Sequence, residues 1–313
     1  MIRTIAKRLL ALVPMLFVVS FVVYSLVLLV PGDPAVTLAG DNPTAEQIAE
    51  TRVRLGLDDS ILVQYGRWVS NAVQGDLGES LYSTQPVSTS VMSRLPTTLS
   101  LTFAAIGFAL LVAVPAGLLA ARRPRGIVDR LTSVGSSIGV ALPSFWVGLV
   151  LIVIFTIKFD LLPPVGYVGL SDNPLEWLSH IALPAVALGS VAAAETTRQL
   201  RGAMVDVLKT DYVRTATAAG IRQRSVILRY ALKNAASPVL TVVGLQVTFL
   251  LGGSAIVERM FNIPGLGSLA IDAVLSRDLP VIQGVIIVAV IVSVLANLLV
   301  DVAYGMLNPK VRV

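Results

Sequence analysis

The sequence predicts an all-α protein that crosses a membrane several times, and three observations point to this fold class. Hydrophobic residues occupy 55% of the 313 positions and charged residues only 14%, whereas a soluble domain usually carries about 25% charged residues. The mean hydropathy is +0.81. Several runs without an ionisable side chain are long enough to cross a hydrocarbon core about 30 Å thick.

Six predominantly apolar runs are expected to form transmembrane helices. They are Leu9–Val30, Leu99–Ala121, Leu131–Ile157, Leu178–Thr197, Val239–Val257 and Val281–Val300. A cleaved signal peptide is the alternative for the first run, because Arg3, Lys7 and Arg8 precede it. Its apolar stretch exceeds the roughly 7–15 residues of a signal-peptide core, so we expect a membrane-spanning helix instead.

The basic residues predict the orientation of these helices. Of the 24 Lys and Arg residues, 17 fall in the N-terminal segment, in the stretches 122–130 and 198–233, and in the C-terminal tail. Cytoplasmic loops carry an excess of Lys and Arg, so segments 1–8 and 306–313 are expected in the cytoplasm. The placement of these residues in short loops reports topology, and no nucleic-acid partner is expected despite the net charge of +5.

Segment 31–98 is then expected on the extracytoplasmic side of the membrane, and it holds eight acidic residues against four basic ones. We expect a small extracytoplasmic subdomain with an amphipathic helix over Thr44–Leu57, which Thr44 and Gln47 begin as a capping box. A second short helix is expected over Gln64–Val73. The subdomain either caps the mouth of a pore or docks a partner protein, and the sequence leaves both alternatives open.

Missing motifs exclude several function classes. There is no cysteine, hence no disulfide and no thiolate metal site. No Gly-x4-Gly-Lys-Ser/Thr motif occurs, so the chain has no P-loop for ATP. His180 is the single histidine and has no metal-ligand companions, so no metal or cofactor is expected in this chain. Glu195, Glu258 and Asp301 lie at or just beyond the ends of the expected spans, and the middles of the spans carry no charge, which disfavours an ion-coupled carrier.

The stretch between the fourth and fifth expected spans, residues 199–238, is the most informative part of the sequence. Lys209–Gly220 is expected to form a short helix that Thr210 or Asp211 begins. Gly220 is placed to end it in a left-handed turn. The apolar stripe of this helix contains Tyr212, Val213, Ala216 and Ala219.

A second helix is expected from about Arg224 to Ala235, and Pro238 is expected to begin the next span. The small residues of the first helix suit a contact inside another protein's groove. An interfacial amphipathic helix without a partner is the alternative, and the residues alone favour neither.

The stretch Asp211-Tyr-Val-Arg-Thr-Ala-Thr-Ala-Ala-Gly220, followed by Ile227 and Asn234-Ala-Ala-Ser-Pro238, resembles the EAA loop of ABC importer permeases. It is most similar to the oligopeptide and dipeptide branch, and the similarity runs through almost the whole chain. Further matching motifs are Pro31-Gly-Asp-Pro34, Leu55-Gly-Leu-Asp58, Gly75-Asp-Leu-Gly78, Arg94-Leu-Pro, Pro143-Ser-Phe-Trp146, Pro264-Gly-Leu-Gly267 and Arg277-Asp278. Two positions depart from the family pattern: Arg214 replaces the leading acid of the generic loop, and Asn308-Pro-Lys310 replaces Asp-Pro-Arg.

This resemblance implies a multi-pass permease of the bacterial inner membrane, the B-type subunit of a type I importer, with its core over 99–305. It implies a second permease subunit as a heterodimer partner, two ABC ATPase subunits that bind ATP and Mg, and an extracytoplasmic substrate-binding protein. The chain itself would catalyse nothing and would contact lipid and a peptide substrate. The residues expected to couple to the ATPases are Asp211, Tyr212, Val213, Arg214, Ala216, Ala219, Gly220 and Ile227.

Among these residues, Tyr212, Ala216 and Gly220 are the foremost candidates, and a larger side chain at Ala216 is expected to wedge the contact with the ATPase. Residues that bind substrate cannot be named from the sequence. Three alternatives stay open: the same importer carrying a nickel chelate, glutathione or haem; an ATPase-independent secondary carrier; and a nutrient sensor or scaffold.

Overall fold

A computed structural model describes residues 2–27, 35–36, 39, 43–83 and 85–307, and within them the regular elements are helices. The extended pairing in this part of the chain is a single antiparallel bridge between Glu79 and Pro86. The expected all-α class is therefore what the described residues adopt.

The helices follow one another along the chain with short connections. Their bounds are α1 Ile2–Val27, α3 Ala45–Leu55, α4 Ile61–Val73, α5 Val87–Arg122, α6 Ile127–Ala141, α7 Ser144–Leu151, the π-helix η1 Ile152–Lys158, α8 Pro174–Leu208, α9 Asp211–Ala218, α10 Gln223–Ser225, the π-helix η2 Val226–Ala231, α11 Leu232–Met260, α12 Leu266–Ser276 and α13 Leu279–Leu307.

Within the described residues, four helical stretches are long and apolar enough to cross a membrane, and a bent pair would make a fifth. The four are Val87–Arg122, Pro174–Leu208, Gln223–Met260 and Leu279–Val300, and they contain the second, fourth, fifth and sixth expected spans. The first expected span coincides with α1 up to Val27, and residues 28–30 lie outside the described part of the chain.

The third expected span, Leu131–Ile157, is not one straight helix. The chain bends by 102° between Ile127–Ala141 and Ser144–Lys158. Pro143 causes the break, because a proline disfavours helical geometry in the residue before it. Leu142 accordingly has φ −84° and ψ 124°, and its N–H still closes the last turn of α6 on Ile138.

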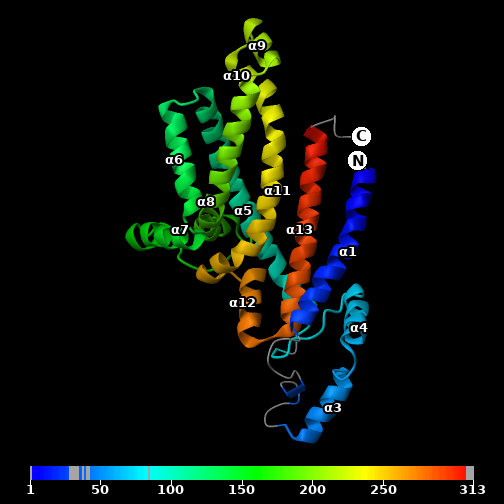
Figure 1. Cartoon of the computed structure of the whole chain (residues 1–313). Coiled ribbons are helices and arrows are strands. Elements are labelled where there is room, and N and C mark those ends of the chain that lie inside the picture. Colours follow the sequence, from blue (N-terminus) through cyan, green and yellow to red (C-terminus); the bar gives the residue numbers. More distant parts are fainter. Residues whose placement is uncertain (1, 28–34, 37–38, 40–42, 84, 308–313) are drawn as a thin grey trace.

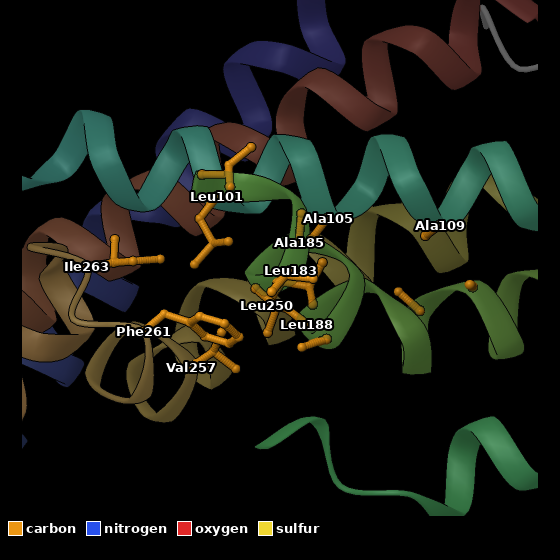
Figure 2. Close-up of a cluster of buried hydrophobic side chains, with 14 residues drawn as sticks. Leu101, Ala105, Ala109, Leu183, Ala185, Leu188, Leu250, Val257, Phe261 and Ile263 are labelled. Carbon is orange, nitrogen blue, oxygen red and sulfur yellow. The ribbon is translucent and has the colours of Figure 1, made fainter. Parts of the chain in front are cut away.

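The core is built around α5 and α8, which lie side by side (Figure 1). Figure 2 shows small and branched side chains of both helices meeting those of α11, among them Leu101, Leu183 and Val257. Gly189 permits the close approach, since a Cβ there would lie 2.5 Å from the carbonyl oxygen of Ala105. Small residues serve the same purpose in membrane-helix contacts generally.

Prolines lie inside several long helices without ending them. Pro238 is within α11, so the expectation that it begins a span is wrong. The second short helix expected over Arg224–Ala235 is not separate either, because this range runs from α10 through η2 into the first turn of α11. A proline removes one backbone donor and crowds the preceding turn. The stretch η2, which directly precedes α11, is a π-helix. This wider winding often marks an irregular point in a helix.

Two helices form in the segment expected to be an external subdomain: α3 ends two residues before the expected Leu57, and α4 begins three residues before the expected Gln64. Thr44 and Gln47 make the capping box, with the Gln47 N–H donating to Thr44 Oγ1 at 3.3 Å. The Tyr65 ring of α4 stacks on Trp68 and meets Phe21 of α1 edge to face, so α4 packs on α1. α5 begins at Val87, twelve residues before the expected start of its span at Leu99.

The ends of the molecule differ in what they carry (Figure 1). α9 and α10 protrude at the end where both termini lie, and α3, α4 and α12 lie at the opposite end.

Candidate coupling site

α9 forms where the sequence places a short helix, and its ends have identifiable causes. Thr210 precedes the helix with extended φ and ψ, and Asp211 supplies a negative charge to its first turn. The Thr210 hydroxyl donates to the carbonyl of Val207 at 2.6 Å, so it holds α8 rather than capping α9. Gly220 has φ +75°, which confirms the expected left-handed turn.

One face of α9 packs against the rest of the same chain. Val213 and Ala216 are buried together with Val226, and Leu208 and Ile221 flank them. Ala216 was expected to face an ATPase, yet in the single chain it forms part of this internal contact. An enlarged side chain at Ala216 would therefore disturb the attachment of α9 to η2 before it met a partner.

Ile227 is also internal. It is buried between α8 and the start of α11, in a cluster with Leu200, Met204 and Ala231. Of the eight predicted coupling residues, Val213, Ala216 and Ile227 thus position the helix in the isolated chain and do not contribute exposed surface.

The other five predicted residues are exposed: Asp211, Tyr212 and Arg214 lie on α9, and Ala219 and Gly220 directly follow it. Asp211 and Arg214 form a weak surface ion pair at 3.5 Å, of the i,i+3 kind. The Tyr212 side chain is 42% exposed, and its hydroxyl accepts a hydrogen bond of 2.8 Å from Asn234 Nδ2. This bond ties the exposed face of α9 to α11, the helix that continues through the core.

A buried ion pair joins α6 to α8, and the sequence did not reveal it. Asp129 accepts two hydrogen bonds of 2.7 Å from Arg201, from Nε and Nη2, and a third of 2.7 Å from the backbone N–H of Arg125. The Asp129 side chain is buried, so its charge requires these donors. An acid in the otherwise basic stretch 122–130 was the only available signal.

The end of the molecule opposite α9 has its own polar junction, centred on Glu258. This fully buried carboxylate accepts from Thr98 Oγ1 at 2.8 Å, from Ser254 Oγ at 2.9 Å and from the Ser268 N–H at 2.9 Å. It thereby joins α5, α11 and the first turn of α12. Glu258 was expected only at the end of a span, and its complete burial depends on α12 folding back over it.

A third polar contact lies between α8 and α11 within the core. The buried Gln246 amide donates to the carbonyl of Ala192 at 3.1 Å and accepts from Thr196 Oγ1 at 3.0 Å. The described residues contain no group of three or more His, Asp or Glu side chains that could hold a metal ion.

These features define a multi-pass helical membrane protein with a short helix protruding at the end that carries the termini. Two family models match the sequence: the binding-protein-dependent transport system inner membrane component over residues 113–313, and the N-terminal membrane component of such systems over residues 1–102. The chain belongs to this family, the permeases of ABC importers, and is a multi-pass protein of the inner membrane.

Curated relatives match along their whole length. The chain is 43% identical over 312 residues to the glutathione transport system permease protein GsiC of Escherichia coli O6:H1. The alignment covers 100% of this chain and 99% of the relative. It is 42% identical, with the same coverage, to GsiC of Escherichia coli K12 and of Shigella dysenteriae.

Solved structures support the fold. A structure described as inward-facing conformations of the MetNI methionine ABC transporter matches with a TM-score of 0.58 and 18% identity, covering 69% of this chain and 95% of that chain. At this identity the likeness concerns the type I importer fold alone.

Proposed function

We propose that this chain is the B-type permease subunit of an ATP-driven importer and forms half of a translocation pathway for di- or oligopeptides. A second, different permease completes the pathway. Two ABC ATPases bind ATP and Mg and dock on the exposed face of α9, and an external binding protein delivers the peptide. The chain itself has no part in the chemistry of ATP hydrolysis.

The observation that carries the proposal is the construction of α9. Val213 and Ala216 fix the helix to the chain, whereas Asp211, Tyr212 and Arg214 stay exposed. Tyr212 also joins the helix to α11 through its hydrogen bond with Asn234. A rigidly attached helix with a free face can transmit a push from a partner into the helix that follows it, because the two move as one body. α11 contributes to the same core as α5 and α8.

Glutathione is the second candidate substrate, because the relatives at 42–43% identity are named glutathione permeases. Glutathione is itself a small peptide with free carboxylates, so both candidates require a pathway that accepts a small peptide carrying a carboxylate. Nickel chelates and haem have no comparable support among these relatives.

The test is ATP hydrolysis by the complete complex in lipid, containing this chain, its paired permease, the ATPases and the binding protein. We expect stimulation that requires both the binding protein and either glutathione or a mixed pool of short peptides. Stimulation by glutathione alone would select the second candidate. Assembly with no response to either would overturn the peptide assignment, and failure of any ATPase to associate would overturn the role of α9.

A further inference from the structure

A polar cavity of 430 Å³ lies at the end of the molecule opposite α9. It opens between α5, the segment before α8, the end of α11 and the start of α12. The side chains that matter for its chemistry are Arg94, Tyr167, Glu258, Arg259, Asn262 and Asp272. Its volume falls in the range of about 300–1,000 Å³ that small-molecule sites occupy.

Three of the four charged groups in this cavity already have partners. Arg259 Nη1 lies 2.8 Å from Asp272 Oδ1, so these two charges neutralise each other. Glu258 is fully buried, and its two oxygens accept three hydrogen bonds from Thr98, Ser254 and Ser268.

Arg94 differs from these groups. It is half-buried at the external end of α5, and in the described part of the chain its guanidinium makes no hydrogen bond or ion pair. A guanidinium presents five N–H donors in a planar fork that matches a carboxylate with two parallel bonds. A half-buried cation of this kind without a partner therefore favours a planar anion in the cavity.

We propose that Arg94 binds the carboxylate group of the transported solute as it enters the pathway. The inference rests on the proposed function and names the part of the substrate that this chain recognises. Arg94 is a substrate-binding residue that the loop motif did not indicate.

A neighbouring groove supplies space for the rest of such a solute. It has a volume of 810 Å³ and shares Tyr167 with the polar cavity. Pro96, Phe103 and Trp177 give it a largely apolar lining. A short peptide whose carboxylate meets Arg94 would find apolar surface for its side chains beside Tyr167, a combination of polar anchor and apolar wall that is typical of ligand sites.

The experiment compares Arg94→Gln with wild type in proteoliposomes that contain the complete complex and a saturating amount of binding protein. The probes are trialanine and glutathione, and the readouts are the rate of uptake and the amount imported per ATP hydrolysed. We expect Arg94→Gln to lower uptake of both probes about tenfold or more, as loss of a charge-assisted pair implies.

Two variants act as controls. Arg94→Lys keeps the charge but loses the fork, so we expect intermediate uptake. Arg67→Gln removes one positive charge from the same side of the protein, where Arg67 pairs with Asp59 outside the cavity, and uptake should change less than about twofold.

The outcomes separate the hypotheses. If the wild-type complex takes up neither trialanine nor glutathione, the proposed substrate class itself is rejected. Normal uptake by wild type and by Arg94→Gln alike would reject only the role of Arg94. A weakened affinity of the binding protein for the Arg94→Gln complex, measured by biolayer interferometry, would reassign Arg94 to protein docking. If Arg94→Gln fails to assemble, the wild-type complex with saturating binding protein is compared on trialanine and its C-terminal amide. Faster uptake of the free carboxylate would support the proposal, and equal or slower uptake would overturn it.

Discussion

Glu258 and Thr98 lie 160 residues apart in the sequence, and a buried hydrogen bond of 2.8 Å joins them. Thr98 Oγ1 donates to the carboxylate and also accepts from the backbone N–H of Leu266 at 2.7 Å. The hydroxyl is therefore the bridge between the end of α11 and the first turn of α12. It places the Pro264-Gly-Leu-Gly267 turn on the core of the protein.

Replacing Thr98 by Val tests this bridge. The substitution keeps the shape and leaves both the Leu266 N–H and one bond of Glu258 unsatisfied in a buried place. We expect the free energy of unfolding to fall by about 1–3 kcal/mol. Thermal unfolding of the purified protein in lipid nanodiscs measures it.

Thr102, one turn further along α5, offers a matched control. It is equally buried, and its hydroxyl has no hydrogen-bond partner among the residues that the structure describes. Thr102→Val removes an unsatisfied polar atom, so we expect no loss of stability and a small gain. Equal losses at both positions would show that β-branched packing, and not the Glu258 junction, determines the result.

The Asp129–Arg201 pair is expected to hold α6 against α8. Arg201→Gln leaves the buried Asp129 carboxylate with a single backbone donor and should cost about 3 kcal/mol of stability. Arg201→Lys should cost less, because the charge remains although the two-pronged geometry is lost. The same unfolding assay applies to both variants.

Arg198→Gln, on an exposed position of the same helix, is the control and should be neutral. Combining Arg201→Gln with Asp129→Asn should cost less than the sum of the two single changes, because neither partner is then left charged and alone. Strict additivity would contradict the ion-pair interpretation.

Ala216 and Ala219 separate internal packing from partner contact on α9. Ala216 is buried against the chain, so Ala216→Leu should destabilise the isolated permease by about 1–3 kcal/mol through overpacking. Ala219 is exposed, so Ala219→Leu should leave that stability unchanged and weaken retention of the ATPases. Co-purification of the ATPase subunits and unfolding of the isolated chain are the two measurements.

A stable Ala216→Leu chain that loses its ATPases would show that α9 turns its inner face outward in the complex. An Ala219→Leu complex that retains its ATPases and transports normally would remove Ala219 from the coupling surface.

Gly220 tests the turn after α9. A β-branched residue strongly resists φ +75°, whereas Asn adopts such geometry at a modest cost. An added Cβ meets no atom within 4 Å, so the backbone and not crowding sets the effect. We expect Gly220→Val to abolish uptake at a normal level in the membrane and Gly220→Asn to retain most of it. Normal uptake by Gly220→Val would remove the turn from the coupling mechanism.

Much of the architecture could be predicted because its signals are local. Long uncharged runs mark the spans, a Thr–Gln pair three residues apart marks the start of α3, and Gly220 marks the end of α9. Each depends on the residues within one or two helical turns. The start of α3, the end of α9 and the second, fourth, fifth and sixth expected spans appear where expected, whereas the third expected span is bent.

Local signals in the sequence are sufficient to predict a helical membrane protein, the start of α3 at Thr44 and the turn at Gly220 after α9, since hydropathy and capping act over neighbouring residues. The packing of distant segments, in contrast, determines that Glu258 is fully buried, that Asp129 meets Arg201, and that α9 turns Val213 and Ala216 inward. These outcomes depend on contacts between residues far apart in the chain. The type of a residue limits the contacts that it can make, and the packing of the helices determines which other side chain it contacts.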